Sequence, residues 1–536
     1  MLRSGQNVDV QGEWTGELVG PDVWATCREL IPAGSVFAFL GEHRAALFPP
    51  EMFADMYPSP NGRPSMPPQV LAAAVLLQAL NGLSDFETVQ ELRCDLRWKA
   101  ACGLGLYDTG FDPSLLAYFR RRLARSRDPQ RIFAAVRAVV AESGVLKGKM
   151  RRALDSTVLD DAVATQDTVT QLIAAIRRVA REVPGAPEAI AAVCSAHDYA
   201  DPGKPRIAWN DEQARADLVD ALVSDAIRLL AALPEREHGP GAADALGLLA
   251  LVAGQDVQPA DGSDGRDGRW RITRGTAENR VISTVDPESR HVHKTRSHKQ
   301  DGYKAHLAVE PQTGIYTAVA IRPGAGPEHH EAVVALDLLD QDGQATCLDL
   351  FGDTAYSSGD ASAALRERGH RLFLKPAPVK TAVPGGFGLD DFAIDTTAGL
   401  VTCPAGHTVP LAPPGGANRQ RKAVFDQCPA CPLREQCTKA KAGRVLTIRP
   451  HHDQQKAARR QAATDPAWQA AYRRWRPPVE RAVAWLVAAG NRRLRYRGTI
   501  ANNTWIHTRA AALNLRTLLG LGLTRSNGRW SLPTPA

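Results

Sequence analysis

The sequence lacks acidic residues over one long stretch: from Pro466 to the C-terminus, Glu480 is the single Asp or Glu, although 23% of the chain is charged. It also lacks any run of about 18 apolar residues, the length that a membrane-spanning helix needs, and its N-terminus has no apolar segment of the signal-peptide type. Nine cysteines in 536 residues are too few and too unevenly placed for a secreted disulfide framework. These absences predict a soluble protein of the cytoplasm, with no membrane partner.

The stretch without acids belongs to a strongly basic region. Between Arg419 and Arg516 there are 21 lysines and arginines against 5 acids, a local excess that the formal net charge of +7 for the whole chain conceals. Such an excess is typical of a surface that faces a polyanion, and a solvated helical face is the alternative interpretation.

Changes in pattern divide the chain into five segments, since 536 residues are too many for one compact domain. We predict an N-terminal helical domain at 1–145, the first part of an α/β core at 146–375 with a helical insertion at about 162–255, a β-rich insertion with a cysteine cluster at 376–450, a C-terminal helical part of the core at 451–525, and a tail at 526–536.

Local patterns predict the elements within these segments. Asn81-Gly82 ends one helix, and Ser84 with Glu87 three residues later forms a capping box that starts the next. A strand-like run at 153–158 is followed, after the helical stretch, by strands at 303–309 and 315–321 that a Pro-Gln-Thr-Gly turn joins into a hairpin. Helices and strands then alternate up to residue 375. This order predicts an α/β fold, a mixed sheet with helices on its faces.

Three carboxylates are predicted to form one site. Asp155 and Asp353 each end a short apolar run, and strand ends in open α/β sheets are where ligand groups gather. If the two strands are parallel neighbours, the aspartates lie side by side, and they repel each other unless a cation lies between them. Glu480 is the one acid that the last helical region can add. Three such acids suit a pair of Mg²⁺ or Mn²⁺ ions in phosphodiester chemistry.

Structural roles for the same residues stay open at this point. Asp155 is also explained as a strand-end cap, with Asp160 or Asp161 as the true ligand. Asp353 is also explained as a turn residue, with Asp349 in its place.

A cysteine cluster predicts a second metal site. Cys428, Cys431 and Cys437 follow Cys403 in a glycine-rich region that has no obvious apolar core. The C-x2-C spacing is typical of tetrahedral Zn²⁺, which would give such a region its fold. His407 is an alternative to Cys403 as ligand, and metal-free thiols or a redox role are alternatives to zinc.

These motifs resemble those of the DDE transposases of bacterial insertion sequences, which have an RNase H-like catalytic core. The resemblance extends from about Arg63 to Leu523. It is carried by the sequences "RPSMPPQVLAAAVLLQALNGLSDFETVQELRCDLRW", "LDSTVLDDA" at Asp155, "DPESRHVHKTRSHKQDGYKAHLAVE", "GDTAY" at Asp353, "CPACPLREQC" and "RPPVERAV" at Glu480.

The resemblance implies an enzyme that cleaves DNA at the ends of a mobile element and then joins the freed 3′-hydroxyl to target DNA. Asp155, Asp353 and Glu480 would be its catalytic residues and its Mg²⁺ ligands. The implied partners are double-stranded DNA and a second copy of the chain in a synaptic complex at the nucleoid, with the N-terminal domain serving DNA binding or dimerisation. The expected DNA contacts are Arg476, Arg481, Arg492, Arg493, Arg495 and Arg497.

The chain departs from the family pattern at one position. Related enzymes often carry a lysine seven residues after the glutamate, where this chain has Val487, so we expect the arginines that follow to take over that DNA contact. Tyr472 lies near the position of the family's aromatic residue. Two rivals stay open: a nuclease with the same core that lacks strand transfer, and a non-catalytic DNA-binding derivative. A third, a zinc-dependent hydrolase, does not explain the three acids.

Overall fold

The computed structural model describes residues 10–13, 18–59, 62, 64–233, 238–264, 269–273, 277, 279–293, 299–343, 347–416 and 418–533. Residues 1–9 of the predicted N-terminal domain and 534–536 of the predicted tail lie outside the described residues.

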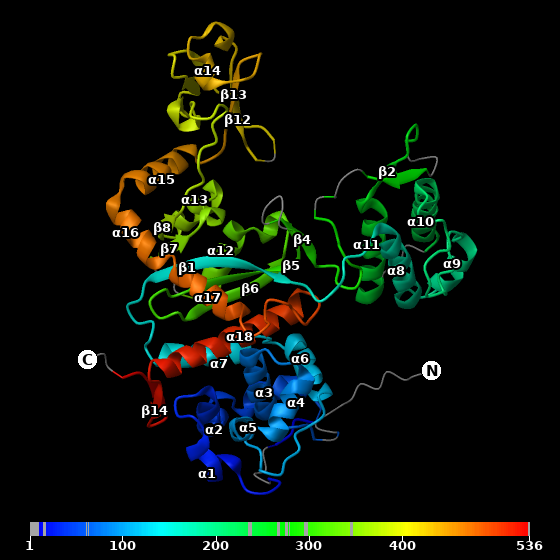
Figure 1. Ribbon diagram of the computed structural model, residues 1–536, viewed down its shortest axis with the longest axis vertical. Coiled ribbons are helices and arrows are strands. Elements are labelled where there is room, and N and C mark those ends of the chain that lie inside the picture. The colour runs from blue at the N-terminus through cyan, green and yellow to red at the C-terminus, as the bar shows by residue number, and fades with distance from the viewer. Residues whose placement is uncertain are drawn as a thin grey trace.

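A six-stranded sheet forms the centre of the molecule (Figure 1). The strand order is β4–β5–β1–β7–β8, and β6 also pairs with β5. β5 is antiparallel to β1, β4 and β6, whereas β7 is parallel to β1 and β8. The strands are β1 (Arg151–Asp160), β4 (Arg290–His293), β5 (Lys299–Val309), β6 (Tyr316–Pro323), β7 (Asp349–Gly352) and β8 (Arg371–Leu374). The predicted mixed sheet and the β5–β6 hairpin are therefore confirmed.

Helices cover both faces of this sheet, because alternate residues of each strand point to opposite sides. Leu154 and Ala308 face a core shared with α12 (Glu331–Asp342), and Ala153 and Leu307 face a core shared with α17 (Pro478–Val487) and α18 (Thr499–Gly520). α13 (Gly359–Glu367) packs against β8. The α/β class is therefore that of a sheet between two helical layers.

The N-terminal helices pack against α18, on the side away from the sheet (Figure 1). The capping box of Ser84 and Glu87 is confirmed, and Gly82 ends α3 with a φ of 70°, a conformation that favours glycine. None of the described helices is by itself long and apolar enough to cross a membrane; α3 and α4 pass such a test only as a pair bent by 110°. The helices are α1 (Val23–Cys27), α2 (Val36–Leu47), α3 (Pro68–Asn81), α4 (Asp85–Cys94), α5 (Leu96–Cys102), α6 (Ser114–Arg125) and α7 (Arg131–Glu142).

Two further units project from the core in Figure 1. A helical unit follows β1 and buries its own apolar cluster. A smaller unit of short strands lies between β8 and the last helices and has a separate apolar cluster. The first contains α8 (Thr168–Glu182), α9 (Ala186–Val193), α10 (Glu212–Ala232), α11 (Pro240–Gln255), β2 (Val257–Pro259) and β3 (Trp270–Ile272); the second contains β9 (Ala393–Asp395), β10 (Leu400–Thr402), β11 (Thr408–Pro410), β12 (Arg421–Phe425), α14 (Arg434–Cys437) and β13 (Arg444–Ile448).

The C-terminal region differs from the sequence expectation at two points. The segment predicted as helical at 451–525 is broken between α15 (His452–Thr464) and α16 (Pro466–Trp475), where the Asp465 side chain caps α16. The segment predicted as a tail begins inside a hairpin of β14 (Thr524–Ser526) and β15 (Arg529–Ser531), and Trp530 of this hairpin is buried against the N-terminal helices.

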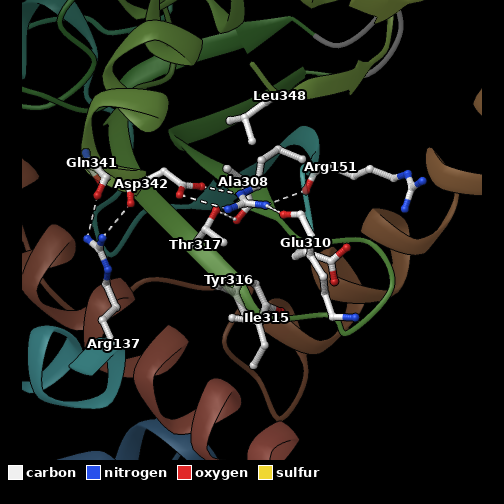
Figure 2. Close-up of polar contacts among 12 residues, drawn as sticks. Arg137, Arg151, Ala308, Glu310, Ile315, Tyr316, Thr317, Gln341, Asp342 and Leu348 are labelled. Carbon is white, nitrogen blue, oxygen red and sulfur yellow. Dashed lines mark hydrogen bonds and ion pairs between the residues drawn. The ribbon is translucent and has the colours of Figure 1, made fainter. Parts of the chain in front are cut away.

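A buried ion pair fastens β1 to the end of α12. Arg152 is fully buried, and its Nε donates to Asp342 Oδ2 at 2.5 Å. Arg137 of α7 donates to the backbone carbonyls of Gln341 and Asp342 at 2.7 and 3.0 Å, as Figure 2 shows. Removing one partner of a buried ion pair leaves an uncompensated buried charge, so loss of either residue is expected to destabilise the contact between β1 and α12.

Replacing Asp342 with Ala is expected to lower the free energy of unfolding by about 3–5 kcal/mol, because it strands the buried Arg152 guanidinium. Asp340→Ala on the same helix is the matched control, since Asp340 pairs with Arg368 at the surface and should cost less than about 1 kcal/mol. Urea denaturation of both variants measures the difference, and equal losses would contradict the assigned role of the buried pair.

Candidate active site

Asp155 and Asp353 are brought together by the parallel pairing of β1 with β7. Arg151 lies opposite Asp349 and Ala153 opposite Phe351, a constant offset of 198 residues (349 − 151). Extending this register by two residues puts Asp155 opposite Asp353, which directly follows β7. Burial raises the pKa of the Asp155 carboxyl, and the nearby charge of Asp353 raises it further. The two aspartates are therefore neighbours across parallel strands.

The expectation that Asp155 ends its strand is wrong. It lies in the middle of the ten-residue β1, because β5 pairs with β1 from Ala153 to Asp160 and keeps it extended. The parallel neighbour β7 is shorter and stops at Gly352. Asp155 therefore lies in the part of β1 that extends past the end of β7. β7 does not pair with β1 there, so this part of β1 forms an edge of the sheet.

Glu480 lies in the first turn of α17, which contacts β1. Pro478 occupies the first position of this helix, where the missing N–H costs nothing. Val479 and Ala482 are buried against the sheet, whereas the Glu480 side chain is 72% exposed. The third predicted acid is therefore on the helix that covers β1, with its carboxylate on the solvent side.

Arg476 lies between two of the three acids. Its Nη2 donates to Asp155 Oδ2 at 3.1 Å, and its Nη1 is 3.8 Å from Glu480 Oε1. The residue is only 8% exposed. Burial raises the pKa of Asp155, and the charge of this guanidinium opposes that effect. The side chain expected to contact DNA thus faces the acids in this structure.

Tyr472 is within electrostatic range of all three predicted acids. Burial raises the pKa of its hydroxyl; the Arg476 guanidinium lowers it, and each of the three carboxylates raises it. The ring stacks on Trp468 with centroids 5.1 Å apart.

Two residues near the site were not singled out from the sequence. Tyr356 is buried three residues after Asp353, and its hydroxyl has no hydrogen-bond partner among the described residues. Glu331 begins α12 and accepts hydrogen bonds from Ser156 Oγ at 3.1 Å and Lys304 Nζ at 2.9 Å. Tyr356 follows Asp353 by three residues, and this short spacing could have pointed to it. No local sequence pattern could have pointed to Glu331, because 175 residues separate it from Ser156.

The alternative acids are engaged elsewhere. Asp349 lies at the other end of β7 and pairs with Arg371 at 2.6 Å. Asp160 accepts a hydrogen bond from Gln300 at 3.1 Å, and Asp161 accepts one from the hydroxyl of Ser289.

In the part of the chain that the structure describes, no group of three or more His, Cys, Asp or Glu side chains is arranged to hold a metal ion. The donor chemistry at the acids nevertheless suits Mg²⁺, because carboxylate oxygens are the ligands it prefers. Buried polar atoms without a hydrogen-bond partner among the described residues also lie here, namely the Tyr356 hydroxyl and Nε and Nη1 of Arg476, although the charged guanidinium cannot itself bind a cation. Completing the set of three requires the exposed Glu480 side chain to turn inward.

The arginine-rich segment between α17 and α18 is attached to the end of β1. The Asp160 N–H donates to the Arg492 carbonyl at 2.9 Å, and the Leu494 N–H donates to the Asp160 carbonyl at 2.8 Å. The strand that carries Asp155 therefore also holds the basic segment, five residues further along.

The other arginines that are predicted to contact DNA are exposed, and they lie in the arginine-rich segment or, for Arg481, on α17. Arg495 donates to the carbonyl of Gly82 at the end of α3, so the segment also touches the N-terminal helices. The exposed arginines are Arg481, Arg492, Arg493, Arg495 and Arg497.

The four clustered cysteines lie around one small cavity, together with His407. All four are free thiols. Burial raises the pKa of the Cys437 thiol; Arg444 opposes this, and the other three thiols raise it further. The fold thus brings the residues that the C-x2-C spacing singled out to one cavity, although no three of these described side chains are arranged to hold a metal ion in this structure. These residues are Cys403, Cys428, Cys431 and Cys437.

Comparison with known protein families gives two matches. Residues 402–519 match the family described as "Transposase DDE domain", and residues 26–122 match the one described as "Transposase domain (DUF772)". The first match includes Glu480 and the arginine-rich segment but not the two aspartates. No curated protein and no solved structure matches the chain.

The two matched segments are similar to transposase families, and together with the paired aspartates and the glutamate on the covering helix they support a DDE transposase of an insertion sequence. The resemblance drawn from the sequence is therefore confirmed.

Proposed function

We propose that this transposase cleaves DNA at the ends of its mobile element and joins them to target DNA at the acids Asp155, Asp353 and Glu480, on an RNase H-like core. The register that sets Asp155 opposite Asp353, with the helix of Glu480 packed on the same strand, is the observation that carries the proposal. The three residues come from distant parts of the sequence. A strand-end cap or a turn residue would not need to lie near acids from other parts of the chain.

Each side chain has a role that its position supports. The three carboxylates would hold Mg²⁺ or Mn²⁺, which when bound supplies an activated nucleophile and stabilises the leaving oxygen. The Asp155 side chain is only 14% exposed and is fixed by its strand, so it would give the site a rigid ligand. Glu480 is exposed and would close the site from the helix. Exposed arginines beside the acids would offset the repulsion between phosphates and carboxylates.

Double-stranded DNA is the proposed partner, at the element's ends and at the target, and synapsis of two ends requires a homodimer or larger assembly at the nucleoid in the cytoplasm. A nuclease without strand transfer has the same acids and differs only in the products that it forms. A non-catalytic derivative is disfavoured by the paired register of the aspartates.

Asp155→Asn, Asp353→Asn and Glu480→Gln are each expected to reduce Mn²⁺-dependent cleavage of an end-bearing duplex at least about 100-fold, because each removes a ligand charge. Asp349→Asn is the matched control, since this acid of β7 pairs with Arg371 away from the site, and it should cut like the wild type. Gel analysis of cut and joined products measures both steps.

Equal cutting by wild type and Glu480→Gln would reject the acid assignment. Cutting without any joined product, under conditions that allow synapsis, would favour the nuclease.

Replacing Arg492 and Arg493 with Ala is expected to weaken duplex binding and to lower the slope of log K against log salt by about 0.9 for each phosphate that is no longer neutralised. Arg181→Ala on the helical unit is the control, because this exposed arginine lies at the end of α8, outside the basic segment. Fluorescence anisotropy across a salt series gives both slopes. An unchanged slope in the double variant would show that the segment does not bind DNA.

We also propose that Cys403, Cys428, Cys431 and Cys437 hold a structural Zn²⁺, with His407 as the alternative to Cys403. Short strands around the cavity offer only a small apolar cluster, and a tetrahedral metal is a usual way to stabilise such a unit.

The purified full-length protein is expected to contain about one Zn²⁺ per chain, and Cys428→Ser with Cys431→Ser is expected to lose it and to make residues 376–450 sensitive to protease. Cys94→Ser is the control, since Cys94 is an exposed thiol of α4. Elemental analysis measures the zinc content, and limited proteolysis measures the protease sensitivity. A wild-type protein without zinc, or a Cys428→Ser, Cys431→Ser protein that retains zinc, would contradict the proposal.

A further inference from the structure

The position of Arg476 is unusual for a residue expected to contact DNA. Its guanidinium is buried beside Asp155 and within 3.8 Å of Glu480. Nε and Nη1 are buried and have no hydrogen-bond partner among the described residues. Leaving buried donors unpaired costs free energy, so the contacts of this guanidinium with the acids are incomplete, and two of its nitrogens can still gain hydrogen-bond partners.

We propose that Arg476 is a displaceable counter-ion of the acid site: it compensates Asp155 and Glu480 while divalent ions are absent, and it moves to the DNA backbone when ions and DNA bind. This inference rests on the proposed function and adds a control on when the site accepts metal.

The charges of the site support this exchange. Asp155 is largely buried next to Asp353, and such a pair is unfavourable unless a cation compensates it. One guanidinium compensates only part of the charge of three carboxylates. A pair of divalent ions would compensate all of it, and the guanidinium would then be a like charge beside them. Like charges a few ångströms apart in a partly buried site repel more strongly than they do in bulk water, because the effective dielectric constant is lower there.

The backbone around Arg476 restricts how the exchange can occur. Arg476 is the C-cap residue of α16, and Pro477-Pro478 follow it directly. Its N–H donates to the Tyr472 carbonyl at 3.0 Å. The proline rings and this hydrogen bond fix the main chain, so the movement must be a rotation of the long side chain.

The destination of the side chain is indicated by its exposed neighbours. Arg473 and Arg474 precede Arg476, and Arg481 follows Glu480, all with exposed side chains. A phosphate backbone drawn to this surface by those charges would lie within reach of a guanidinium that turns outward. Arg476 would then exchange carboxylate partners for phosphate partners, which suit its planar donors equally well.

The test is direct measurement of Mn²⁺ binding to the DNA-free full-length protein, by the EPR signal of free Mn²⁺. Arg476→Gln is expected to bind Mn²⁺ at least about tenfold more tightly than the wild type, because the competing cation is gone. Arg476→Lys, which keeps one charge but cannot span two acids, should lie between them. Arg460→Gln is the matched control, since it removes an exposed arginine from the neighbouring helix α15, and it should bind like the wild type.

Asp155→Asn separates this inference from the proposed function. If Asp155→Asn abolishes Mn²⁺ binding while Arg476→Gln and Arg476→Lys leave it unchanged or weaker, the counter-ion role is overturned and the metal site stands. If no variant shows Mn²⁺ binding that depends on Asp155, both are overturned. Thermal unfolding with and without Mn²⁺ checks that each variant folds, and Mn²⁺ should raise the Tm of Arg476→Gln more than that of the wild type.

Discussion

The parallel pairing of β1 with β7 is the constraint on which the site depends. It fixes two carboxylates, 198 positions apart (353 − 155), on neighbouring strands, where their mutual repulsion is large unless cations are present. The buried pair of Arg152 with Asp342 holds the same strand against α12, and β5 pairs with β1 from Ala153 onward. The pairing of β1 with β5 and β7 and the buried pair of Arg152 with Asp342 therefore all help to fix the position of Asp155.

This rigidity contrasts with the other half of the site. Glu480 and Arg476 lie on one short helix and the turn before it, where side chains can rotate while the backbone is fixed by prolines. The same helix leads into the arginine-rich segment that is bonded to the end of β1. A rigid aspartate pair that faces an adjustable glutamate and arginine suits a reaction in which both ions and DNA must enter before chemistry begins.

The sequence predicted those features that depend on local patterns. The capping box at Ser84, the mixed sheet and the isolation of Glu480 among arginines were all readable, because caps, periodicity and charge act over a few residues. The site of Asp155 within a long strand was not, since the length of β1 is set by its partner β5 rather than by its own residues. Nor was the burial of Arg476 against Asp155, a contact between residues 321 positions apart. Such contacts depend on strand register, which no local pattern specifies.

The most direct test of the acid site and its counter-ion is anomalous diffraction from crystals of the protein bound to an end-bearing duplex and Mn²⁺. We expect manganese peaks bounded by the carboxylates of Asp155, Asp353 and Glu480, with the Arg476 guanidinium turned away from Asp155 to a phosphate. Manganese bound elsewhere, or an Arg476 that still pairs with Asp155 beside an empty set of acids, would contradict this expectation.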